Sequence, residues 1–314
     1  MKKRYWLTAA TALIASSLAA KLFLRPRDVD WEKSREIVFH ADYSRFTEVD
    51  GVRIHYQEAG RSDAPAVILI HGFATSNLVW SNVLLELADA GFRVIAPDLL
   101  GYGYSAKPRE LDYTIVRQGQ MVLSLLEQLK IDRVILVGSS YGGAIAATIA
   151  LDRPKLVEKL VLIGAVTNNK PTRYLLMRLF SSPIIGDILS PLVVGSRRLL
   201  RFRMKRVYDR HSLALDERRV DARHLPLRTA GVHRAIIRTV RRWDADRVSR
   251  EAYLIRAPTL LLWGDNDREV PLQDGEHLHR EIPNSRLVVF RECGHLPHEE
   301  YPQAFTKVVS EFCA

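Results

Sequence analysis

Hydrophobic and polar positions alternate between two patterns along most of the chain. Short, nearly continuous apolar runs predict strands that are buried on both faces of a parallel sheet. These predicted strands span Val52–Ala59, Ala66–Ile70, Arg93–Ala96, Arg133–Val137, Lys159–Ile163, Thr259–Trp263 and Arg286–Phe290. Between them lie helix-like segments at Asn77–Ala90, Ile115–Leu129 and Gly142–Leu151. This alternation predicts an α/β fold with a mostly parallel sheet and right-handed crossover connections.

The alternation stops near Thr167 and resumes near Pro258. The intervening sequence has only helix-like stretches, at Thr172–Phe180, Ser196–Tyr208 and Val232–Trp243. An inserted helical lid over the carboxyl ends of the strands, where open α/β sheets bind ligands, explains this pattern. We therefore divide the chain into a membrane anchor or signal peptide (1–28), a first part of the core (29–167), a helical lid insert (168–247) and a second part of the core (248–314).

The N-terminus has the pattern of a targeting segment. MKKR precedes the apolar run YWLTAATALIASSLAA, and small residues near Ala20 fit a cleaved signal peptide. An uncleaved anchor over Tyr5–Leu24 is the alternative. The basic residues Lys21, Arg25 and Arg27 oppose export of the following chain, so we favour the anchor. This predicts a membrane-associated protein, or an exported one if the segment is cleaved.

Positive charge is concentrated in the insert. The chain has 46 Lys and Arg against 36 Asp and Glu, a net charge of +10, and 19 of these cations but only 7 of these anions lie between Asn168 and Arg247. Such a patch predicts contact with an anionic membrane surface. We do not expect nucleic-acid binding, because no reading motif or aromatic stacking platform accompanies the charge. The two cysteines, Cys293 and Cys313, are too few for a disulfide framework or a metal cluster, and are either free thiols or one bridge.

The stretch GSSYGG at 138–143 joins a predicted strand to an Ala-rich helix. In a G-x-S-x-G corner the flanking positions must be small, because the backbone folds tightly around an exposed nucleophile. Ser140 fits this frame with Gly138 and Gly142, whereas a frame on Ser139 would place a valine and a tyrosine there. Ser140 is therefore the candidate nucleophile, and an ordinary glycine-rich helix start is the alternative.

A serine nucleophile needs a base, and the base needs an acid that fixes its tautomer. His295 follows the last predicted strand in VVFRECGHLPHEE and is the candidate base, with His298 as the alternative. The stretch LLLWGDNDREVP places Asp265 and Asp267 just after a buried strand. We favour Asp267, which lies in a G-x-x-D-x-x-x-P frame, because Asp265 has the position of a residue that caps its own turn.

The oxyanion formed in acyl transfer needs hydrogen-bond donors. One candidate is the backbone N–H of Tyr141, directly after the nucleophile. The second is the N–H of Phe73, in the sequence VILIHGFATS that follows an early strand.

Together these motifs resemble the α/β-hydrolase family of the lid-bearing type, over about Phe46 to Phe312. The chain order Ser140, Asp267, His295 is the order expected in that family. The stretch DLLGYGYS from Asp98 also resembles a family loop that is structural and borders the pocket. The resemblance implies an eight-stranded, mostly parallel sheet, hydrolysis through an acyl-enzyme, and no metal or organic cofactor.

The serine at position 140 argues against the epoxide and halide chemistry of relatives that use aspartate there. We expect a serine hydrolase of carboxylic esters with lipid, medium-chain acyl or monoacylglycerol-like substrates, because Tyr174–Phe180 and Ile184–Val194 offer apolar groups for an acyl chain. The alternative is a carbon–carbon bond hydrolase of dienoic acids, in which a lid arginine such as Arg228 or Arg234 would hold the acidic substrate. A ligand-binding protein with the same fold but without useful turnover is the third reading.

Overall fold

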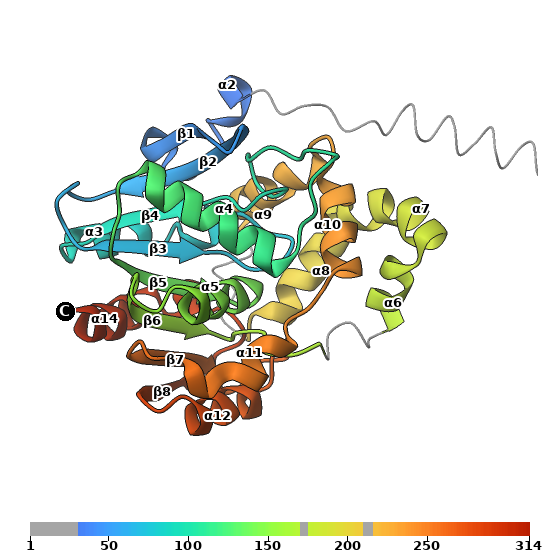
Figure 1. Ribbon diagram of the computed structural model, residues 1–314. Helices are drawn as coiled ribbons and strands as arrows, with labels where there is room; N and C mark the ends of the chain where they lie inside the picture. Colours follow the sequence, from blue (N-terminus) through green and yellow to red (C-terminus); the bar gives the residue numbers. More distant parts are fainter. Residues whose placement is uncertain (1–30, 170–174, 210–215) are drawn as a thin grey trace, which may run out of the picture.

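The chain folds around one eight-stranded sheet with helices on both faces (Figure 1). The computed structural model describes residues 31–169, 175–209 and 216–314. Its strands are β1 (Ser44–Val49), β2 (Val52–Ala59), β3 (Ala66–Ile70), β4 (Arg93–Pro97), β5 (Val134–Ser139), β6 (Val157–Ile163), β7 (Thr259–Gly264) and β8 (Ser285–Phe290).

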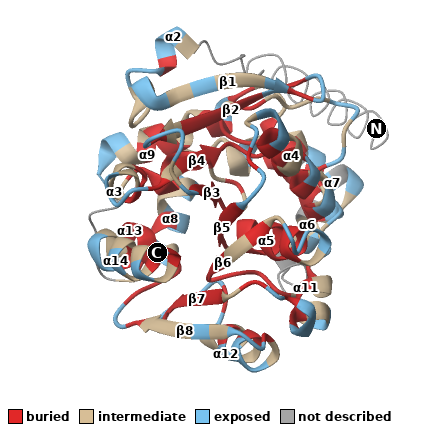
Figure 2. Cartoon of the chain, turned by 60° about the vertical axis from the view of Figure 1, so that its left-hand side comes forward, coloured by how far each residue is buried: buried red, intermediate tan, exposed pale blue. Residues whose placement is uncertain are grey.

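The strands lie in the order β1-β2-β4-β3-β5-β6-β7-β8. Strand β2 is antiparallel to both of its neighbours, and every other neighbouring pair is parallel. The inner strands are almost entirely buried, whereas the edge strands β1 and β8 are partly exposed (Figure 2). The predicted fold class, a mostly parallel eight-stranded α/β sheet, is confirmed.

The continuous apolar runs are explained by two hydrophobic cores, one on each face of the sheet. Successive strand residues point to opposite faces. In β3, Ile68 and Ile70 therefore pack in the core formed with α4 and α5, while Val67 and Leu69 pack in the core formed with α3 and α14. The helices of the core are α2 (Trp31–Ser34), α3 (Leu84–Asp89), α4 (Ile115–Gln128), α5 (Tyr141–Asp152), α12 (Leu272–Glu281), α13 (Pro297–Glu300) and α14 (Pro302–Cys313).

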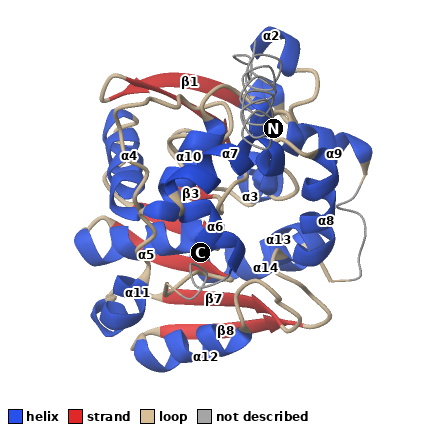
Figure 3. Cartoon of the chain, turned by 90° about the vertical axis from the view of Figure 1, so that its right-hand side faces the viewer, coloured by secondary structure: helices blue, strands red, loops and turns tan. Residues whose placement is uncertain are grey.

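Between β6 and β7 the described chain is helical and lies beyond the carboxyl ends of the central strands (Figures 1 and 3). These cap helices are α6 (Leu175–Ser181), α7 (Pro183–Val194), α8 (Arg197–Val207), α9 (Glu217–His224), α10 (Val232–Arg241) and α11 (Asp246–Glu251). The two ends of the insert meet where Asn169 donates from its backbone N–H and its side chain to the Asp246 carboxylate, at 2.7 and 2.8 Å. The domain boundaries themselves remain a prediction.

The predicted location of the protein needs correction. In the parts of the chain that the structure describes, no helix has the length and apolar character needed to cross a membrane. The prediction of membrane association through an N-terminal segment is therefore wrong for the described chain. Both that prediction and its exported alternative depended on residues 1–28. These residues lie outside the part of the chain that the structure describes.

Both cysteines are free thiols. Cys293 and Cys313 are buried and form no disulfide. Burial raises the pKa of Cys313 to about 12, and burial together with the nearby Glu300 carboxylate raises that of Cys293. Both thiols are therefore protonated near neutral pH and poor nucleophiles.

Candidate active site

The GSSYGG stretch is a tightly constrained corner between β5 and α5. Ser140 has a left-handed backbone, with φ 55° and ψ −117°. A Cβ at Gly138 would overlap the Gly142 carbonyl, and a Cβ at Gly142 would overlap the Ile70 carbonyl. The two flanking positions must therefore be glycine, as the sequence frame predicts, and the alternative of an ordinary helix start does not describe this geometry.

The structure brings His295 and Asp267 together as a hydrogen-bonded pair. His295 Nδ1 lies 2.7 Å from Asp267 Oδ2, and both side chains are almost fully buried. Asp267 Oδ1 accepts from the backbone N–H groups of Glu269 and Val270, at 2.8 and 2.9 Å. Because an ionised carboxylate can only accept, Nδ1 carries the proton and Nε2 is left to accept one.

The charge environment raises the pKa of His295. Burial alone lowers that pKa, but the Asp267 carboxylate, its hydrogen bond and the charges of Glu269 and Glu300 raise it by more. Space for the pair is left by Gly164, where φ is 46° and a Cβ would lie 2.9 Å from His295 Nδ1. The pair is therefore built to stabilise a protonated imidazole.

The alternative base and acid lie elsewhere. His298 is fully buried and does not line the cavity, and its ring lies 4.4 Å from that of Trp80. Burial and the nearby positive groups hold the pKa of His298 well below its usual value. Asp265 accepts from the Cys293 backbone N–H at 3.3 Å and so joins its loop to that of His295, whereas the bonds within the turn itself go to Asp267 and not, as expected, to Asp265.

The loop after β3 lies against the nucleophile. A Cβ at Gly72 would stand 3.2 Å from Ser140 Cβ, so this glycine permits the close approach. No group in the described residues accepts a hydrogen bond from the backbone N–H of Phe73 or of Tyr141. Both predicted oxyanion donors are therefore beside Ser140 and free to donate to a ligand.

His71, which the sequence reasoning did not single out, fixes that loop. Its Nε2 accepts from the Leu99 N–H at 3.0 Å, so its Nδ1 donates to the Gly72 carbonyl at 2.8 Å. Burial lowers the pKa of this imidazole and keeps it neutral. The sequence His71-Gly72 directly before Phe73 was the signal that could have identified His71 as the residue that fixes this loop.

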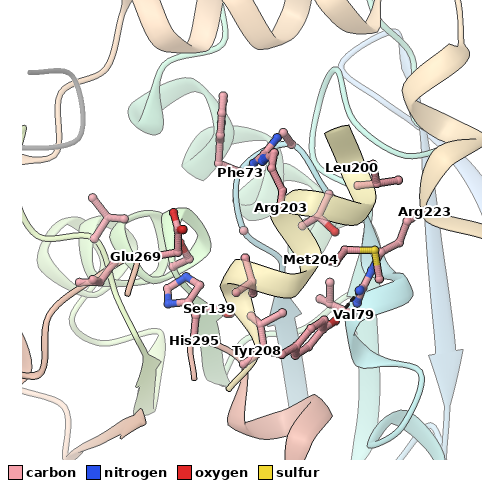
Figure 4. A pocket seen from close by; sticks show the side chains of 18 of the residues that line it. Phe73, Val79, Ser139, Leu200, Arg203, Met204, Tyr208, Arg223, Glu269 and His295 are labelled. Carbon is pink, nitrogen blue, oxygen red and sulfur yellow. Dashed lines mark hydrogen bonds between the residues drawn. The ribbon is translucent and has the colours of Figure 1, made fainter. Parts of the chain in front are cut away.

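A cavity of about 190 Å³ joins these groups beneath the cap (Figure 4). Ser139, Ser140 and His295 line its floor, and the cap helices form its opposite wall. Most of the lining is apolar, with Phe73, Val79, Met177, Leu200, Met204 and Trp243 among its side chains. Of the two segments predicted to hold an acyl chain, Tyr174–Phe180 contributes Met177, and none of the side chains that the structure describes in Ile184–Val194 lies in the lining.

Two arginines of the described cap residues line the cavity, and neither is one that the sequence reasoning named. Arg228 and Arg234 lie outside the lining, and Arg234 instead donates to the Lys107 carbonyl at 3.0 Å. The lining arginines are Arg203 and Arg223. The suggestion of Arg228 or Arg234 is therefore corrected, because the choice among many cap cations depends on contacts that a sequence does not display.

The charge of Arg223 is compensated within the protein. Arg223 donates to the Tyr208 hydroxyl (Figure 4) and to both carboxylate oxygens of Glu299. The Tyr208 hydroxyl itself lies 3.0 Å from Glu299 Oε2. Burial lowers the pKa of Arg223, but Glu299 and Tyr208 raise it by more than burial lowers it, so Arg223 is charged. Arg203, in contrast, has no carboxylate partner among the described residues and projects from α8 into the cavity.

The cap is joined directly to the loop of the candidate base. The His295 backbone N–H donates to the Val207 carbonyl at the end of α8, at 2.8 Å. Glu300 bridges the same two segments, because it accepts from the backbone N–H of Gly294 at 2.8 Å and of Asp209 at 3.0 Å. Within residues 31–169, 175–209 and 216–314, no group of His, Cys, Asp and Glu side chains is arranged to hold a metal ion.

Fold, elbow and histidine–aspartate pair together are those of an α/β hydrolase. The family model described as "alpha/beta hydrolase fold" matches residues 65–302, and the chain belongs to that family. The expected resemblance is thus confirmed.

Individual relatives match most of this chain. The uncharacterized hydrolase YugF of Bacillus subtilis is 30% identical over 85% of this chain and 96% of its own length. A 2-hydroxy-6-oxononadienedioate/2-hydroxy-6-oxononatrienedioate hydrolase of Cupriavidus pinatubonensis is 30% identical over 88% of this chain and 97% of its own. Among solved structures, a bacterial membrane phospholipase A is 26% identical with a TM-score of 0.74, over 100% of this chain and 98% of its own.

Proposed function

We propose that this α/β hydrolase is a serine hydrolase with Ser140, His295 and Asp267 as its catalytic triad. The observation that carries the proposal is that His295, which is paired with Asp267 at 2.7 Å, lines the same cavity as the strained Ser140. His295 Nε2 accepts the Ser140 proton while the serine oxygen attacks a substrate carbonyl carbon. The N–H groups of Phe73 and Tyr141 hold the oxyanion. His295 then protonates the leaving group, and later activates the water that releases the acyl group.

The adjacent serines provide a matched test. We expect Ser140→Ala to abolish labelling by a fluorophosphonate and to lower kcat by up to about a million-fold, because serine and histidine of a triad act as one unit. Ser139→Ala should retain labelling, since the Ser139 hydroxyl is buried without a partner among the described residues. Labelling of Ser140→Ala at the wild-type rate would refute the assignment.

Cleavage of a carbon–carbon bond in a dienoic acid is the first candidate for the reaction. It is supported by the 30% identity to the Cupriavidus pinatubonensis hydrolase, whose name gives a dienedioate as its substrate. Arg203 supports it as well, because a cation that lines the cavity and has no carboxylate partner among the described residues can hold a substrate carboxylate. In this reaction the carbon leaving group takes its proton from His295 as the acyl-enzyme forms.

Hydrolysis of a lipid or medium-chain acyl ester is the second candidate. The mostly apolar lining suits an acyl chain, and Glu299 already neutralises Arg223, so Arg203 is the one lining cation without a carboxylate partner in the part of the chain that the structure describes. The membrane phospholipase A that matches the full length of this chain also supports it.

A substrate panel separates the candidates. A 2-hydroxy-6-oxo-dienoic acid and 4-nitrophenyl esters of increasing acyl length should be supplied to wild type, Arg203→Gln and Ser140→Ala. Carbon–carbon bond hydrolysis predicts dienoate turnover in which Arg203→Gln raises KM by about 10- to 100-fold, with little effect on esters. Ester turnover without dienoate turnover supports the second candidate. Stoichiometric binding of either compound without multiple turnovers would instead indicate the non-catalytic reading.

A further inference from the structure

Helix α8 has a second face that the proposed chemistry does not use. Along Arg197–Val207 the helix carries six Arg or Lys residues and no Asp or Glu. Leu200, Met204 and Val207 line the cavity from one side of the helix. Because the helix repeats every 3.6 residues, Phe202 points to the other side, where its side chain is 68% exposed.

Cations flank this exposed ring. Arg198 lies four residues before Phe202 and Lys205 three residues after it, so both share its side of the helix. Both are exposed, and neither has a carboxylate partner in the part of the chain that the structure describes. We call Arg198, Leu199, Phe202 and Lys205 the outward face of α8.

Three other cations of α8 pair with carboxylates of neighbouring segments. Arg197 and Arg201 both pair with Glu217 of α9, and Arg206 pairs with Glu269 after β7 at 2.9 Å. These ion pairs and the inner apolar contacts fix the orientation of the helix. The outward face is therefore presented by a firmly held helix.

Further apolar side chains are exposed nearby. Leu199 on the outward face is 42% exposed, and α7, which packs against α8, exposes Ile185 at 44% and Leu192 at 56%. A single exposed leucine is ordinary. Exposed aromatic and aliphatic groups among unpaired cations instead have the composition of helices that lie in a membrane interface.

We propose that the outward face of α8 docks on the surface of a bilayer that contains anionic phospholipids. Phe202 and Leu199 enter the region between headgroups and acyl chains, while Arg198 and Lys205 approach headgroup phosphates. The excess of 19 cations over 7 anions in the insert adds attraction at longer range. Nucleic acid is disfavoured as the occupant, because Phe202 is the sole aromatic residue of α8 and offers no row of stacking platforms. In the docked protein one side of α8 lies on the lipid surface, while the opposite side of the same helix lines the cavity.

A local fluorescent label tests the contact in the full-length chain. An environment-sensitive dye on Phe202→Cys is practicable because both native cysteines are buried. We expect a blue shift with vesicles of phosphatidylcholine and phosphatidylglycerol, a smaller one with phosphatidylcholine alone, and loss of the shift at high salt. The control is Val116→Cys on α4, which is 49% exposed and should show no shift. The label reports this face even if other parts of the chain touch the bilayer.

Absence of a blue shift at position 202 with anionic vesicles would overturn the proposal. A shift that appears with RNA or with an acidic protein, but not with vesicles, would overturn it equally.

The cations provide a second, independent measurement. In the labelled chain, Arg198→Gln with Lys205→Gln should weaken binding to anionic vesicles by about 30-fold, the loss expected for two surface cations. The control pair, Arg256→Gln with Arg280→Gln, removes two exposed cations far from α8 that also have no described carboxylate partner, and should change affinity by less than about threefold. Equal affinities of the two pairs would refute the proposal. Binding should persist in Ser140→Ala, so this result is separate from that of the catalytic assignment.

Discussion

Ser140 illustrates how far single residues could be predicted. Its left-handed backbone costs about 1–3 kcal/mol and persists only where neighbours enforce it. Here its N–H donates to the Ile163 carbonyl at 2.8 Å, and its own carbonyl accepts from Gly143 and Val166. Because the need for small flanking residues is local, the sequence frame was sufficient to place the strained corner at Ser140, and its role as nucleophile remains a prediction.

Arg203 and Arg223 show where such reasoning ends. Their roles depend on which cap cations face the cavity and which carboxylate each one meets. Arg223 meets Glu299, 76 residues later in the chain, and Glu299 has no distinctive local signal beside His298. Only the folded chain distinguishes these two arginines from the many others of the insert.

The pH dependence of activity should report the His295–Asp267 pair. The neutral imidazole acts as the base, and the pKa of His295 is raised above its usual value of about 6.5. The value of kcat/KM should therefore fall as the pH decreases through a pKa higher than that of a free histidine. A pH profile on any accepted substrate measures this limb.

Asp267→Asn is the companion variant. It removes the main group that raises the pKa, so the acid limb should move to lower pH while kcat falls by about 10⁴-fold through loss of the correct tautomer. An unchanged limb in Asp267→Asn would contradict the role assigned to this pair. Asp265→Asn is the matched control, and should leave the limb in place.

At the scale of elements, the buried strands were predicted well and the surface elements poorly. Seven strands were placed within about two residues, because continuous apolar runs are typical of strands covered on both faces. Strand β1 was missed, since its burial is irregular along an exposed edge. Helix α7 was missed because Gly186 and Pro191 lie within it.

The segment Asn77–Ala90 was predicted as one helix but is interrupted. Residues Asn77–Trp80 form a 3-10 turn, and α3 begins only at Leu84. The Asn77 N–H donates to Asp98 at 2.7 Å and its side chain to the Ala96 carbonyl at 3.1 Å. These bonds to the end of β4 divert the chain from a regular helix, and Asp98 has the structural role that its loop suggested.

The contact between α9 and α13 should be a major source of stability. Glu299→Gln leaves the buried Arg223 without a compensating charge, so we expect a loss of about 3–5 kcal/mol in the free energy of unfolding. Adding Arg223→Met to this variant should recover much of the loss, because it removes the unpaired charge. Urea unfolding measures both.

The control for that pair is Arg242→Gln. Arg242 is an exposed cap cation with no described carboxylate partner, and its loss should change stability by less than about 0.5 kcal/mol. A similarly small effect of Glu299→Gln would show that the buried pair does not hold the cap.

At the scale of the whole molecule, the topology assembles a site from distant segments. Strands β5, β7 and β8 are parallel and close in the sheet, so the loops that follow them, with Ser140, Asp267 and His295, reach the same edge. This convergence was predictable, because all three residues follow strands of a sheet that the sequence predicts to be mostly parallel. The sequence also indicated a helical insert at this edge, but not the contacts of Val207 and Glu300 that fix it there, because those contacts join segments far apart in the chain.

Glu300 should couple the cap to catalysis. In Glu300→Gln only one side-chain oxygen remains to accept from the N–H groups of Gly294 and Asp209, so one of these stays unsatisfied and stability should fall by about 1–3 kcal/mol. The negative charge that raises the pKa of His295 is also lost, so the acid limb of kcat/KM should move to lower pH. A loss of stability without this shift would mean that Glu300 only supports the fold. Glu292 is an exposed acid of the same loop, and Glu292→Gln should change neither stability nor the acid limb. This control distinguishes the loss of the Glu300 bridge from the loss of any negative charge in the loop.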